Sequence, residues 1–162
     1  MGSGKTTIGK LVSKKLKLDF FDIDRQIESS LQMEIAEIFK KKGESFFRKF
    51  EEKMTLSILA KKKVVVALGG GAFLNKNIRT EVLSNHTSFW LSLNSKTIIK
   101  RIRGNPKRPL AFNSSKNELL KLIKKRANTY SKALYKVDCN GFTKAEVVSD
   151  IINIYEANKI NS

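Results

Sequence analysis

The chain opens with the segment GSGKTT at residues 2–7, which constrains its fold more than any other part of the sequence. A phosphate-binding loop needs glycines, so that backbone N–H groups can surround phosphate oxygens. It also needs a lysine that reaches the β- and γ-phosphates and a hydroxyl group for Mg²⁺. Gly4, Lys5 and Thr6 follow one another in that order. We therefore expect nucleotide phosphates to bind here; a flexible N-terminal tail is the alternative.

The residues after this loop predict the helix that such a site requires. One apolar stripe at helical spacing is formed by Ile8, Leu11, Val12 and Leu16. A helix whose N-terminus faces the loop adds its own attraction for anions.

Strands alternate with helices along the rest of the chain. Apolar runs predict strands at 17–22, 64–68, 88–91 and 135–139. Helical patterns are expected at 4–16, 25–31, 34–41, 44–60, 77–83, 95–103, 116–134 and 144–158. This alternation is typical of an α/β protein with a mostly parallel sheet.

Size and composition exclude several classes of protein. The 162 residues suit one domain, 1–162, and no apolar run approaches the roughly 18 residues that a membrane span needs. The single cysteine, Cys139, cannot form an internal disulfide, and one histidine nearly excludes histidine-based metal sites. We expect a cytoplasmic protein without a membrane partner.

The charge is strongly positive, at +17 from 32 Lys and Arg against 15 Asp and Glu. Such a surplus can serve nucleic acid, a membrane surface or small anions. Most of it is lysine in runs such as 40–42 and 61–63, which favours a solvated surface. We therefore expect no nucleic-acid partner. The few arginines are the better candidates for binding anions, because a guanidinium group grips a carboxylate or phosphate with two hydrogen bonds.

Two further motifs follow predicted strands. Asp22 and Asp24 are two positions apart, so in a strand both carboxylates would emerge on one side at the carboxyl end, where α/β sheets bind ligands. One could hold Mg²⁺ while the other accepts a hydrogen bond from a substrate hydroxyl; N-capping by Asp24 is the alternative. The run Gly69-Gly70-Gly71 ends the strand 64–68 and exposes backbone N–H groups to a ligand.

Two arginines have less certain surroundings. Arg108 lies between two prolines in the polar segment 105–115, where a mobile cover over phosphates would belong. Arg126 follows two lysines on a predicted helix, so a solvated helix face is its default environment.

These blocks together resemble the shikimate kinase family. The segments that carry the resemblance are GSGKTTIGK, FFDIDRQIE, IAEIF, GESFFRKFEE, ALGGGA, NHTSFWL, NPKRPL and KKRANTY, in the family's order and spacing. The resemblance implies an α/β P-loop kinase with a parallel sheet in the order 2-3-1-4-5, flanked by helices. It also implies a substrate-binding segment at about 24–51 and a lid at about 104–115. We expect a monomer. The implied reaction is phosphorylation of the 3-hydroxyl of shikimate by ATP, in chorismate and aromatic amino-acid biosynthesis.

The resemblance also implies a role for individual residues. Lys5, Asp24 and Arg108 are implied as catalytic, and Thr6 with Asp22 as the Mg²⁺ pair. ATP would contact Gly2, Ser3, Gly4, Lys5, Thr6, Thr7, Arg101 and Arg108. Shikimate would contact Asp24, Phe39, Phe47, Arg48, Gly69, Gly70, Gly71 and Arg126. An arginine and a proline that the family places on the adenine side are missing at 140–144.

The chain also departs from the family at its start. The first loop glycine should lie five positions before Gly4, and a strand should precede it. Without that strand, the strands at 64–68 and 88–91 would face each other as unpaired edges. We expect the working protein to carry about 8–15 more residues, one strand's length with its turn. The alternatives to a shikimate kinase are an inactive fragment, a gluconate kinase-like enzyme and a nucleic-acid-binding P-loop protein.

Overall fold

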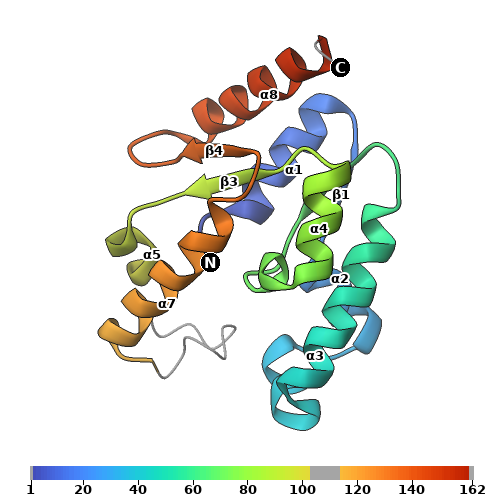
Figure 1. Cartoon of the computed structure of the whole chain (residues 1–162), viewed down its shortest axis with the longest axis vertical. Helices are drawn as coiled ribbons and strands as arrows, with labels where there is room; N and C mark the ends of the chain where they lie inside the picture. Colours follow the sequence, from blue (N-terminus) through green and yellow to red (C-terminus); the bar gives the residue numbers. More distant parts are fainter. Residues whose placement is uncertain (1, 103–113, 161–162) are drawn as a thin grey trace.

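The computed structural model describes residues 2–102 and 114–160 of the chain. Its elements are α1 (Lys5–Leu16), β1 (Asp19–Asp22), α2 (Ile23–Leu31), α3 (Ile35–Leu59), β2 (Val64–Ala67), η1 (Ala72–Leu74), α4 (Lys76–Asn85), β3 (Phe89–Ser92), α5 (Ser95–Ile102), α7 (Lys116–Tyr130), β4 (Tyr135–Asp138) and α8 (Lys144–Ile160). Strands and helices alternate as the sequence predicts, and the expected α/β class is confirmed (Figure 1).

The strands form two parallel pairs. β1 pairs with β2, with Asp19 opposite Val64, and β3 pairs with β4, with Phe89 opposite Tyr135. Within the described residues no hydrogen-bonded ladder joins one pair to the other. In the family's order 2-3-1-4-5, strand 1 is the strand that precedes the phosphate loop, so β1 to β4 correspond to family strands 2 to 5. The observed pairs β1–β2 and β3–β4 are therefore the family's pairs 2–3 and 4–5.

A cavity of about 700 Å³ separates the two pairs. Its walls include β2 residues 64–66 on one side and β3 residues 89–91 on the other. Both strands thus line the same cavity. Gly69, Gly70 and Arg126 also line the cavity, which links the middle of the sheet to the candidate site.

Helices cover both pairs of strands and bury separate apolar clusters. Ile8 and Val12 of α1 pack with Leu91 of β3, Val137 of β4 and Val148 of α8. In the figure, α8 runs along β4, on the side of the molecule opposite the lower end of α3 (Figure 1). Of the predicted α1 stripe, Leu11 is the exception, because it remains 39% exposed.

The second large cluster joins α2 to α3. Its buried members are Ile23, Ile27, Ile38, Phe47 and Ile58. It holds the segment with the candidate substrate residues against the carboxyl end of the β1–β2 pair.

Several element boundaries differ from the sequence-based expectations for local reasons. The two helices expected at 34–41 and 44–60 are present as the two parts of α3, because the backbone leaves helical geometry at Gly43, whose φ of 81° favours glycine. Lys17 ends α1 with φ of 55°, so β1 begins only at Asp19. α7 ends at Tyr130, four residues before the expected end at 134.

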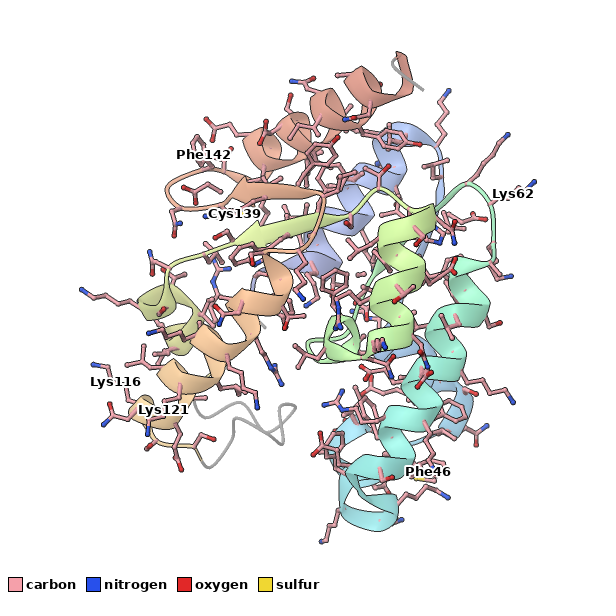
Figure 2. The ribbon with its side chains drawn as sticks, in the orientation of Figure 1. Phe46, Lys62, Lys116, Lys121, Cys139 and Phe142 are labelled. Atoms are coloured by element: carbon pink, nitrogen blue, oxygen red, sulfur yellow. The ribbon has the colours of Figure 1, made fainter. Side chains whose placement is uncertain are left out.

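Part of the lysine surplus lies on the surface of the molecule. Lys62, Lys116 and Lys121 are exposed and point away from the body of the molecule (Figure 2). In the part of the chain that the structure describes, no helix is long and apolar enough to cross a membrane.

Candidate functional site

Glycine conformations shape the loop that begins the chain. Gly2 has φ of 63° and Gly4 has φ of 88°, a region that other residues rarely adopt. Gly4 is the N-cap of α1, and its carbonyl accepts the first helical hydrogen bond, from the Ile8 N–H at 2.9 Å. No side chain caps this helix end. Its N–H groups and helix dipole thus suit a bound phosphate.

Thr6 and Asp22, the predicted Mg²⁺ pair, are in direct contact. The Thr6 hydroxyl donates a hydrogen bond to Asp22 Oδ2 at 2.5 Å. The second Asp22 oxygen accepts a hydrogen bond from the Arg25 N–H at 3.4 Å and caps α2. Mg²⁺ bound to nucleotides uses one or two protein oxygens together with phosphate oxygens and water, so this pair fits that ion. Among the described residues there is no group of three or more His, Cys, Asp or Glu that could hold a metal by itself.

Arg101 lies beside the loop. Its guanidinium Nη1 donates to the Gly2 carbonyl at 3.0 Å. A side chain at Gly2 would also collide with the neighbouring helix, because a Cβ there would lie 2.9 Å from Ile102 Cγ2. α5 and the loop are therefore held together. The predicted adenine contact of Arg101 stays a prediction.

Asp24 lies on a helix, and the strand argument that placed it beside Asp22 is wrong. The strand ends at Asp22, whose side chain caps α2, and Asp24 belongs to the first turn of that helix. N-capping by Asp24 is also wrong, since Asp22 takes that role. Asp24 still faces the glycine run, because a Cβ on Gly69 would lie 2.6 Å from its Oδ1.

The glycines at 69 and 71 allow charged side chains to approach closely. A Cβ on Gly69 would also lie 2.6 Å from Glu51 Oε1, and one on Gly71 would lie 2.4 Å from Arg48 Nη1. Real Cβ atoms essentially never approach other atoms this closely. At these two positions the absence of a Cβ lets α2 and α3 side chains lie against the end of β2, and any larger residue would have to displace the ends of those side chains.

Arg48 is held in a charged and aromatic setting. Its Nη1 donates to Glu51 Oε2 at 2.6 Å, while Nε and Nη2 both donate to Glu44 Oε1 at 3.2 Å. The guanidinium lies over Phe47, 5.1 Å from the ring centroid, and 5.9 Å from that of Phe39. The structure thus brings together the three residues that the sequence predicts for one pocket.

Arg126 is buried, which corrects the solvated default. Its side chain on α7 is only 5% exposed, and its Nε has no hydrogen-bond partner among the described residues. Burial lowers the pKa of Arg126 below its ordinary value, and the nearby positive charge of Arg48 acts in the same direction. A buried Arg with an unused donor beside a second Arg is an environment that favours an incoming carboxylate.

Glu51 is a site residue that the sequence argument missed. It is 2% exposed, and burial raises the pKa of its carboxyl, although the Arg48 charge opposes that shift. The negative charge of Asp24 raises this pKa further, and the positive charge of Arg126 lowers it. Its position three residues after Arg48 on one helix face was the available signal.

The lid remains outside the structural description. Arg108 and the segment 103–113 lie outside the described residues, so the predicted phosphate contact of Arg108 stays a prediction. At the expected adenine side, the Asn94 N–H donates to Asn140 Oδ1 at 2.9 Å, which joins the turns after β3 and β4.

Comparison with known proteins points to one family. The family model described as shikimate kinase matches residues 1–156. A shikimate kinase of Thermodesulfovibrio yellowstonii is 42% identical over 157 residues, covering 96% of this chain and 91% of that protein. One from Bacillus subtilis is also 42% identical, covering 94% of this chain and 83% of that protein.

Solved structures give the same result. The shikimate kinase of Acinetobacter baumannii in complex with shikimate has a TM-score of 0.91 at 28% identity, covering 98% of this chain and 90% of that one. The shikimate kinase of Aquifex aeolicus has a TM-score of 0.88 at 31% identity, covering all of this chain and 95% of that one.

Proposed function

The chain belongs to the shikimate kinase family, and on that premise we propose that it transfers the γ-phosphoryl group of ATP to the 3-hydroxyl of shikimate. The products are shikimate 3-phosphate and ADP, within chorismate and aromatic amino-acid biosynthesis. The observation that carries this proposal is the presence, at the same end of the sheet, of a phosphate loop and a pocket with the buried Arg126 and the half-buried Arg48.

Shikimate is an acid, and its carboxylate would bind to Arg48 and Arg126. Both guanidinium groups can form the paired hydrogen bonds that a planar carboxylate accepts. The unused Nε of Arg126 supports this assignment, as does the electrostatic interaction between the two arginines. Phe39 and Phe47, whose ring centroids are 4.8 Å apart, would give the sugar-like ring an apolar wall.

The hydroxyl groups of shikimate would face Asp24 and the glycine turn 69–71. The closeness of Asp24 and Glu51 to Gly69 supports this placement. Asp24 would accept a hydrogen bond from the reacting 3-hydroxyl and fix its direction toward the phosphate. Phosphoryl transfer depends mainly on such positioning and on charge stabilisation, so a strong base is not required.

The phosphates of ATP would lie in the loop 2–7, with Lys5 reaching the β- and γ-phosphates. Mg²⁺ would be held by Thr6 and Asp22, and when bound it neutralises charge on the β- and γ-phosphates. The 2.5 Å contact between these two side chains supports the pair as one site. Arg108, from the lid at about 104–115, would add positive charge as that segment covers the phosphates, and 24–51 would form the substrate-binding segment.

We place the enzyme in the cytoplasm as a monomer, acting on a small acid. Free Cys139 is compatible with a reducing compartment, since no disulfide depends on it. Sedimentation of the purified protein tests the monomer, and a stable dimer would contradict it.

A coupled ADP-release assay with shikimate, quinate and gluconate side by side tests the main proposal. Turnover that requires ATP and Mg²⁺ and strongly prefers shikimate is expected. Preference for gluconate, or retention on DNA or RNA without phosphorylation of any acid, would refute it.

A further inference from the structure

Tyr130 ends α7, and its hydroxyl reaches the glycine turn. Its Oη donates a hydrogen bond to the Gly70 carbonyl at 2.5 Å, across 60 positions of sequence. The ring is also fixed, because it contacts Trp90 with 6.3 Å between centroids and packs beside the buried Phe73 cluster. This short contact therefore joins two well-packed elements.

The conformation of the glycine turn depends on this bond. The Gly69 carbonyl accepts from the Ala72 N–H at 3.2 Å, and the Gly71 carbonyl accepts from the Leu74 N–H at 3.0 Å. Those two bonds are local to the turn, whereas the Gly70 carbonyl is held by a side chain from another element. Since the peptide group is planar, holding the Gly70 C=O also fixes the direction of the Gly71 N–H.

Tyr130 also interacts with Arg126. The two residues lie four positions apart, one turn along the same face of α7. Burial raises the pKa of the Tyr130 hydroxyl, and the Arg126 charge opposes that shift, with a smaller contribution from Arg48. The phenol consequently keeps its proton near neutral pH and remains a donor. One side chain thus acts on both the turn and the buried arginine.

We propose that Tyr130 is a positioning residue, which holds the Gly70–Gly71 peptide and Arg126 in one fixed relation and thereby sets the affinity for shikimate. It touches neither ATP nor the reacting atoms in this assignment. The inference rests on the proposed function, because it assumes that the turn and Arg126 bind the same small acid.

Tyr130→Phe tests the inference, since it removes the hydroxyl and keeps the ring. We expect the KM for shikimate to rise about 3- to 10-fold, the value of one ordinary hydrogen bond. The KM for ATP should be unchanged, and kcat should stay within about twofold because the transition-state contacts of the phosphate remain. Calorimetric titration with shikimate alone should show the same loss in affinity.

Tyr135→Phe is the matched control. Tyr135 donates an equally short hydrogen bond, 2.5 Å to Asn158 Oδ1, but it joins β4 to α8 away from the glycine turn. Both variants should melt at similar temperatures, and only Tyr130→Phe should weaken shikimate binding. An unchanged shikimate KM in Tyr130→Phe, or an equal rise in both variants, would overturn the inference. Failure of the wild-type protein to phosphorylate shikimate would instead refute the proposed function.

Discussion

Replacing Arg126 with lysine separates charge from shape in the substrate pocket. The change keeps a cation but removes the planar fork, including the Nε that has no partner among the described residues. Arg126 is 5% exposed, so water cannot replace the lost hydrogen bond as it would on a surface. A hydrogen bond to a charged group contributes about 1.5–3 kcal/mol, which corresponds to about a 10- to 150-fold rise in the KM for shikimate.

The assay is steady-state ADP release at saturating ATP, with shikimate varied, followed by the converse titration. The KM for ATP should be nearly unchanged, because the phosphate loop lies on other elements. Arg79→Lys is a suitable control: its Nη1 donates only to backbone carbonyls, of Phe73 at 3.2 Å and Leu74 at 2.9 Å. A folded Arg126→Lys protein with an unchanged shikimate KM would refute the assignment of Arg126 to the pocket.

Four other substitutions test the remaining charges. Asp24→Asn should abolish turnover while Mg²⁺–ATP still binds. Asp22→Asn should instead raise the Mg²⁺ concentration that turnover requires. Equal loss of nucleotide binding in both variants, measured by calorimetry, would contradict this division of roles. Glu44→Gln removes the carboxylate that pairs with Nε and Nη2 of Arg48. The KM for shikimate should fall by up to about fivefold, which is the effect of an exposed ion pair. A raised KM would contradict this expectation. Burial raises the pKa of Glu51 above 4.5, so its contribution to stability should be largest below that pH and decline as pH rises through the raised pKa. Urea unfolding of Glu51→Gln and wild type from pH 4 to 7 measures this, and a pH-independent difference would contradict it.

Features that depend on neighbouring residues could be predicted from the sequence. The positive φ angles of Gly2 and Gly4 and the start of α1 follow from the loop motif itself. The strand at 64–67 could be identified because its β-branched run ends in glycines. Leu11 was misplaced, because helical spacing alone does not define the exact width of the buried stripe.

Features that depend on distant contacts could be predicted only through the family resemblance, or not at all. The burial of Arg126 depends on α7 packing beside the glycine turn, while the two residues before it in sequence are lysines. The Tyr130 contact spans 60 residues, and no local pattern indicates it. Asp24 was correctly placed near the turn for a wrong reason, since the cap formed by Asp22 starts a helix where a strand was expected to continue.

Arg126 is buried in the pocket, and its Nε has no hydrogen-bond partner within the described residues. The positive charge of Arg48 acts unfavourably on that of Arg126, and burial strengthens this repulsion. Glu51 offsets it only partly, since its hydrogen bond goes to Arg48 and leaves the Arg126 Nε unpartnered within the described residues. A fuller set of carboxylates would stabilise the free protein but would compete with the substrate. On the proposed assignment, a bound acid should raise the melting temperature, because its carboxylate would pair with Arg126.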